Sequence, residues 1–176
     1  RYLFFYLNNL KENKDFESAK QISKTLNVLD RNLLINQSKQ WLDKSNYDKF
    51  SQFFSCKNEA DILAEFFFLI SNFYAAERDF KKSNFYLNIS NYLNPKFYFN
   101  LTHLLENYLE NENYKLTRKI LKNFNEGDEV YYWYKLKKMY QIIYNEENPD
   151  QALNYIESKF KEYSNPSVKI IYDMAN

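Results

Sequence analysis

The chain has 176 residues, of which 45% are hydrophobic and 27% charged, which is enough apolar material for one continuous core or a run of small repeats. Its net charge is +1, from 24 Lys and Arg against 23 Asp and Glu mixed along the chain, so it lacks the basic footprint typical of a nucleic-acid binder. The mean hydropathy of −0.70 and the short apolar runs argue against membrane insertion and predict a soluble protein.

Five predicted helix starts divide the chain at nearly regular intervals. The first four pair a helix-capping residue with an aromatic ring, at Asp15-Phe16, Asn46-Tyr47, Asp79-Phe80 and Asn113-Tyr114. Successive rings are 31, 33 and 34 residues apart. Asp and Asn side chains accept hydrogen bonds from the free N–H groups of a first helical turn. A fifth start follows at Asn148-Pro149, where proline suits the first helical position because its missing N–H would have no partner.

Between these starts the apolar residues recur at intervals of three and four, as in Phe67, Ile70 and Tyr74, which is the period of a helix. Short polar stretches before each start predict turns, and no alternating strand pattern is present. We therefore predict an all-α fold of antiparallel helix-turn-helix hairpins that share one elongated core. The expected units are residues 1–30, 31–63, 64–97, 98–132 and 133–166, with a partial unit at 167–176.

The unit at residues 64–97 resembles the tetratricopeptide repeat (TPR). The matching positions, in chain order, are Phe67, Ile70, Ser71, Tyr74, Phe80, Ser83, Leu87, Ser90 and the closing Pro95. The other units match less closely, with Phe50, Leu105 and Tyr140 at positions where the family carries a small residue. The composition and residues 83–97 are also similar to TPR proteins of AT-rich alphaproteobacteria. The resemblance implies a right-handed superhelical stack of hairpins.

Few residues are placed for catalysis or metal binding. His103 is the only histidine and has only Glu106 nearby on its helical face, which is too few groups for a metal or catalytic site. Cys56 follows an apolar segment, so we expect a small buried side chain rather than a nucleophile. Gly127 is the only glycine, which excludes the glycine-rich phosphate loops. We expect a protein that is not an enzyme and that uses neither a cofactor nor a metal.

The TPR resemblance implies a binding surface. In that family the first helices of the hairpins line a concave face that holds peptides. Carried over to this sequence, the inward positions are Asn36, Lys39, Asn72, His103, Glu106, Tyr134, Lys137, Lys138 and Gln141. Lys137 and Lys138 are suited to an acidic segment of a partner, and Tyr134 is expected to expose its ring.

The pattern favours a non-catalytic scaffold that binds a protein or peptide. Three alternatives stay open: an architectural subunit of an oligomeric complex, an RNA-binding helical repeat whose rings stack on bases, and a non-catalytic part of a larger enzyme. Both ends interrupt the pattern, so we expect the natural chain to extend beyond Arg1 and Asn176. The compartment, cytoplasmic or periplasmic, stays open for the same reason.

Overall fold

The computed structural model describes residues 1–27, 29 and 32–176, and this part of the chain is helical without strands. The helices are α1 (Tyr2–Glu12), α2 (Phe16–Thr25), α3 (Leu33–Asp43), α4 (Asp48–Phe53), α5 (Glu59–Ala76), α6 (Phe80–Leu93), α7 (Tyr98–Glu110), α8 (Tyr114–Leu121), α9 (Glu129–Glu146), α10 (Pro149–Lys161) and α11 (Val168–Ala175). The all-α prediction is confirmed, and α11 occupies the expected partial unit. The unit boundary expected at Asp30 and Arg31 lies outside the described residues.

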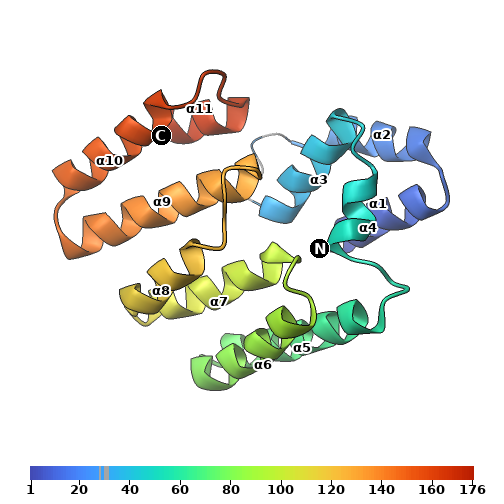
Figure 1. Cartoon of the computed structure of the whole chain (residues 1–176), viewed down its shortest axis with the longest axis horizontal. Helices are drawn as coiled ribbons and strands as arrows, with labels where there is room; N and C mark the ends of the chain where they lie inside the picture. Colours follow the sequence, from blue (N-terminus) through green and yellow to red (C-terminus); the bar gives the residue numbers. More distant parts are fainter. Residues whose placement is uncertain (28, 30–31) are drawn as a thin grey trace.

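The second half of the chain follows the expected succession of pairs. Helices α5 and α6, α7 and α8, and α9 and α10 lie side by side, and each helix of this series packs on the next (Figure 1). Three serines at positions where the TPR pattern has small residues are fully buried here: Ser71, Ser83 and Ser90. The Ser90 hydroxyl donates to the Ala64 carbonyl at 2.7 Å and accepts from Asn100 Nδ2 at 2.7 Å. These small side chains let α5, α6 and α7 approach closely.

The first four helices form a group next to the starts of α7 and α9, with α3 in direct contact with α9 and α2 on the side away from both (Figure 1). Aromatic rings form the junction. Phe97, immediately before α7, contacts the rings of Phe4, Phe53 and Phe54 at centroid distances of 5.5, 5.3 and 5.5 Å. All four rings belong to one buried cluster. Residues separated by more than 80 positions thus share a core.

Four of the five predicted caps are confirmed. The side chains of Asp15, Asp79, Asn113 and Asn148 each accept a hydrogen bond from a backbone N–H in the first turn of the following helix. The cap predicted at Asn46 is wrong. Helix α4 begins only at Asp48, after Tyr47, and has no side-chain cap. This helix has six residues, which leaves it the shortest in the described chain.

The turns within the first four hairpins share one backbone geometry. Each contains a non-glycine residue with left-handed φ between 53° and 61°: Lys14, Ser45, Arg78 and Glu112. In each turn the N–H of the residue after the left-handed one donates to the carbonyl five residues back. For example, the Asn113 N–H donates to the Tyr108 carbonyl at 2.8 Å. This is the Schellman arrangement, in which glycine is usual at the left-handed position. The four residues differ in type, so the repetition is clear only in the backbone.

Glycine at one of these positions should stabilise the protein. For Glu112→Gly we expect the free energy of unfolding to rise by up to about 1 kcal/mol, because glycine adopts the left-handed conformation without the strain of a Cβ. Urea unfolding followed by circular dichroism measures the change. Glu112→Ala is the matched control, since it removes the same side chain but keeps the Cβ. A Glu112→Ala protein as stable as Glu112→Gly would contradict this account of the turns.

Candidate functional site

A groove of about 950 Å³ lies between α3, α7, α9 and α11. Its apolar lining comes from Leu33, Phe99, Val130, Trp133 and Ile170, and most of its remaining lining is polar or charged. This volume is at the upper end of the range for ligand pockets in proteins. The groove therefore has room for several residues of an extended segment.

The structure brings eight of the nine predicted binding residues together in this groove. They are Asn36 and Lys39 on α3, His103 and Glu106 on α7, and Tyr134, Lys137, Lys138 and Gln141 on α9. Asn72, on α5, does not line it. Helix α3 contacts α9, whereas α5 packs on α6, so α3 and α9 both border the groove and α5 is left outside it.

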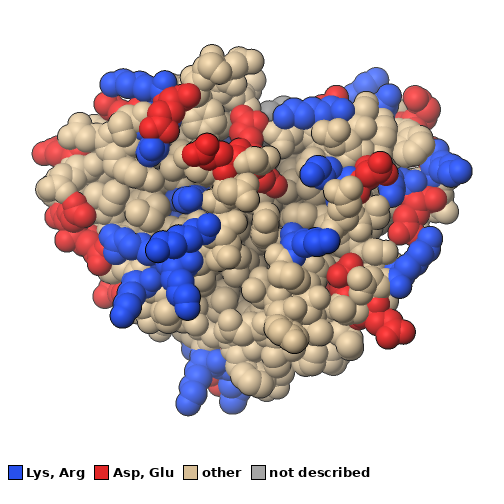
Figure 2. Space-filling model, viewed as in Figure 1, with Lys and Arg blue, Asp and Glu red and all other residues tan. Residues whose placement is uncertain are grey.

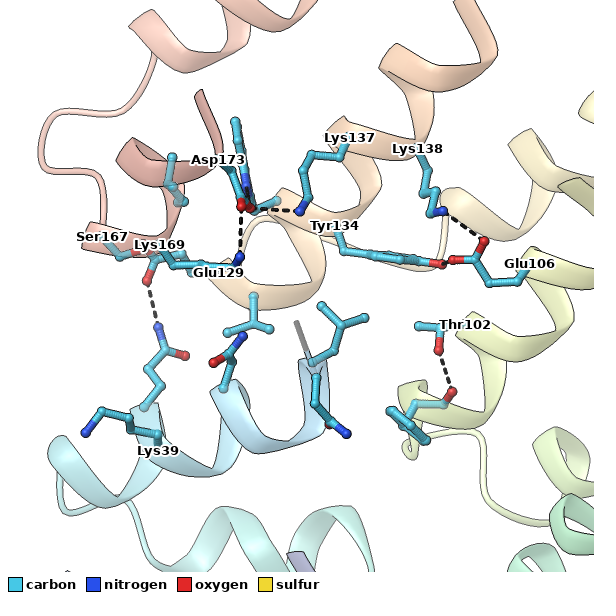
Figure 3. A pocket seen from close by; sticks show the side chains of 18 of the residues that line it. Lys39, Thr102, Glu106, Glu129, Tyr134, Lys137, Lys138, Ser167, Lys169 and Asp173 are labelled. Atoms are coloured by element: carbon cyan, nitrogen blue, oxygen red, sulfur yellow. Dashed lines mark hydrogen bonds and ion pairs between the residues drawn. The ribbon is translucent and has the colours of Figure 1, made fainter. Parts of the chain in front are cut away.

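Glu106 is the centre of a polar cluster on one side of the groove (Figure 3). Its carboxylate accepts from the Tyr134 hydroxyl at 2.6 Å and from Lys138 Nζ at 2.8 Å. The expectation that Tyr134 exposes its ring is wrong. The ring is buried, packs edge-on against Phe124 at a centroid distance of 5.9 Å and lies beneath Lys138 Nζ, 5.6 Å from the ring centroid. Burial, reinforced by the charge of Glu106, raises the pKa of Tyr134 well above 10, which keeps the hydroxyl a donor.

Asp173, on α11, is the centre of a second cluster (Figure 3). Its carboxylate accepts from Lys137 Nζ at 2.7 Å, Trp133 Nε1 at 2.9 Å and Lys169 Nζ at 2.8 Å. Burial acts to raise the pKa of Asp173, but the three hydrogen bonds outweigh it and lower the pKa below 3.8. The carboxylate therefore stays charged and joins α11 to α9. Sequence reasoning missed Asp173, since a lone aspartate in a short helix has no distinguishing pattern.

Polar bonds also fix α3 against the start of α9. Gln40 Nε2 donates to Glu129 Oε2 at 2.7 Å, and Gln37 Nε2 donates to Asp128. Asp128 caps α9 through the N–H of Tyr131. Burial raises the pKa of Asp128, while its hydrogen bonds act in the opposite direction. Helix α3, which forms one wall of the groove, is thus held to the start of α9 by side-chain hydrogen bonds as well as by apolar packing.

His103 lies on the wall of the groove between two rings. Phe68 and Phe99 contact it edge-on at centroid distances of 4.8 and 5.0 Å. Burial, with a smaller effect from the positive charge of Arg1, lowers the pKa of His103 to about 4. The imidazole is therefore neutral near pH 7 and too weakly basic to take up a proton there.

In the ion pairs of α7, α9 and α11, one group of a pair is more open to a ligand than the other. The Lys137 side chain is 42% exposed, whereas its partner Asp173 is 12% exposed. The Glu106 side chain is 43% exposed, whereas its partner Lys138 is 19% exposed. An ammonium has three donors and a carboxylate about four acceptor sites, so neither open group is saturated by its internal bonds. The groove thus presents one open cation on α9 and one open anion on α7.

Cys56 differs from the sequence-based expectation. It is exposed, in the turn after α4, rather than buried. The backbone two residues before Cys56 is held against α1, because Asn8 Nδ2 donates to the Phe54 carbonyl at 3.0 Å. Partial burial, together with the charges of Glu12 and Asp61, raises the pKa of the Cys56 thiol. The thiolate, which is the reactive form, is therefore disfavoured.

Basic side chains gather on the surface over α8 (Figure 2). This helix and the residue after it contribute Lys115, Arg118, Lys119 and Lys122. Arg118 is paired with Glu146 at 2.5 Å. Positive and negative charges are mixed along the sequence, but the fold gathers basic side chains at this place. None of these four residues lines the groove.

Within the described residues, no three His, Cys, Asp or Glu side chains lie close enough to hold a metal ion. Among the described helices, none has both the length and the apolar character needed to cross a membrane. No family model, curated protein or solved structure matches the chain.

Proposed function

We propose that this chain is a non-catalytic scaffold, built as a TPR-like superhelical array, that binds an extended segment of another protein in the groove between α3, α7, α9 and α11. The observation that carries the proposal is the groove's combination of an apolar lining with two open, oppositely charged groups, Lys137 and Glu106. The four turns of equal geometry and the successive packing of α5 to α10 support the array part of the proposal.

The two open charges define the partner's chemistry. An acidic side chain of the bound segment pairs with Lys137, which can donate to it while keeping its bond to Asp173. Lys138 is less accessible and already bonds to Glu106 and Gln141. A donor of the segment bonds to Glu106, and an apolar side chain packs on the lining near Trp133. The expected segment is therefore extended and contains an acidic and an apolar residue.

Peptide selection tests the proposal. Random peptides displayed on phage are selected on the purified chain, and the dissociation constants of the enriched peptides are measured by fluorescence anisotropy. For Lys137→Gln we expect about tenfold weaker binding, equal to about 1.4 kcal/mol, because the charge is lost while the amide can still donate to Asp173. Reversal of Lys137 to Glu is a poorer test, since it would place a second carboxylate beside Asp173 and disturb α11.

Lys115→Gln is the matched control, because it removes the same charge from an exposed lysine on α8 outside the groove. Its peptide affinity should equal that of the unmodified chain. Failure to enrich any peptide, or equal losses for Lys137→Gln and Lys115→Gln, would count against binding in the groove.

A further inference from the structure

Helix α5 is apolar on two opposite faces. Ala64, Phe68 and Ser71 are buried against the rest of the fold. On the other side lies a row that we call the α5 stripe, formed by Ile62, Phe66, Leu69 and Phe73, which are 48%, 55%, 48% and 74% exposed. At about 100° per residue the stripe occupies an arc of roughly 60°. A helix that is apolar all round is normally buried all round, so the stripe points to a missing neighbour.

The helices before α5 leave the stripe open because they are attached elsewhere. Asn94 Nδ2 donates to the Phe53 carbonyl at 3.1 Å, and Asn8 Nδ2 donates to the Phe54 carbonyl at 3.0 Å, which holds the end of α4 near α1 and α6. The Arg1 side chain bonds to Glu65 on α5 and to Asn100 on α7. A cover for the stripe must therefore come from outside the described residues.

We propose that the α5 stripe is the contact of a two-fold symmetric homodimer, in which the α5 helices of two copies pack antiparallel. The spacing carries the inference. The stripe residues are separated by four, three and four positions, and this order reads the same in both directions. In an antiparallel pair Ile62 lies opposite the partner subunit's Phe73, and Phe66 lies opposite the partner subunit's Leu69. A two-fold interface requires this kind of self-complementary surface.

The centre of the stripe carries no charge. No stripe position is charged, and Glu65, which borders it, is paired with Arg1. Two copies can therefore bring their stripes together without burying an unpaired charge.

The area of the stripe fits a moderate interface. With large side chains contributing about 150–250 Å² each, the exposed fractions give roughly 500 Å² of apolar surface per subunit. A standard interface buries about 800 Å² per partner, so flanking residues supply the remainder. The stripe is also about 16 Å long, because Ile62 and Phe73 are eleven helical steps of about 1.5 Å apart. We therefore expect a reversible dimer.

Complementary charges test the register. In size-exclusion chromatography with light scattering at about 100 times an assumed micromolar dissociation constant, the unmodified chain should have twice the mass of the 21.6 kDa monomer. Phe66→Glu and Leu69→Lys should each be monomeric, because self-pairing would bury unpaired charges. An equimolar mixture of the two should return to the dimer mass, because the Glu of one subunit then faces the Lys of the other.

Tyr92→Glu is the control, since it adds a charge at an 85% exposed ring on α6 without touching the stripe; its mass should stay that of the dimer. Circular dichroism checks that each variant keeps its helices. A monomeric unmodified chain overturns the proposal, whether the stripe then binds another protein or nothing. So does a dimer that survives Phe66→Glu, or a mixture that stays monomeric. None of the stripe residues lines the groove, so peptide affinity and dimerisation can fail separately.

Discussion

Phe97→Ala is expected to lower the free energy of unfolding by about 3–5 kcal/mol. Phe97 is fully buried, and its ring contacts Phe4, Phe53 and Phe54 within 5.5 Å. Alanine would leave a cavity where the first four helices meet α7. Because natural domains are stable by only about 5–15 kcal/mol, this loss is a large part of the total.

Denaturation in urea, followed by circular dichroism, measures the effect. Tyr2→Ala is the control, because it removes an aromatic ring from α1 that is 91% exposed. Its expected change is within about 0.5 kcal/mol, as for other surface substitutions. A Phe97→Ala protein as stable as Tyr2→Ala would show that the aromatic junction does not hold the two halves of the chain together.

Asp173→Ala is expected to lower the free energy of unfolding by about 2–3 kcal/mol and to detach α11 from α9. The carboxylate accepts three hydrogen bonds, two of them from lysine ammonium groups, and a hydrogen bond to a charged group contributes about 1.5–3 kcal/mol. The expected loss is below the sum of three such bonds because Lys137, which is 42% exposed, can bond to water instead. Ile170 and Met174 pack with Trp133 and Leu136 in the same cluster, so detachment would also remove one wall of the groove.

Trp133 provides the measurement, because its indole N–H donates to Asp173 and its ring packs against α11. In a Trp41→Phe background, Asp173→Ala should shift Trp133 emission to longer wavelength as the ring meets water. Asp173→Asn should shift it less, since the amide oxygen still accepts from the indole. Unchanged emission in both variants would mean that α11 does not depend on this carboxylate.

The same carboxylate predicts a dependence on pH. The pKa of Asp173 is lower in the folded chain than its ordinary value of 3.8. Its contribution to stability is therefore complete above 3.8 and is lost as the pH falls through the lower, folded-state pKa. The difference in unfolding free energy between the unmodified chain and Asp173→Asn should be constant near neutral pH and shrink below 3.8. A difference that persists at the lowest pH would contradict the assignment.

Local patterns in the sequence were sufficient for most of the helices. Capping by Asp15, Asp79, Asn113 and Asn148 depends only on neighbouring backbone, and a helical period depends only on nearby residues. The prediction at Asn46 was wrong, because α4 begins only at Asp48. The other end of α4 is held by Asn8 and Asn94, and no local signal in the sequence marks those bonds.

The candidate site divides in the same way. The resemblance to the TPR pattern pointed to nine inward positions, and eight of these residues line the groove. Only the tertiary structure placed Asn72 outside the groove, buried the Tyr134 ring and paired Lys137 with Asp173. Those outcomes depend on how the first four helices lie against α7 and α9, and on α11 docking. Both are decided by the total burial and pairing of groups far apart in the chain, which no short pattern contains.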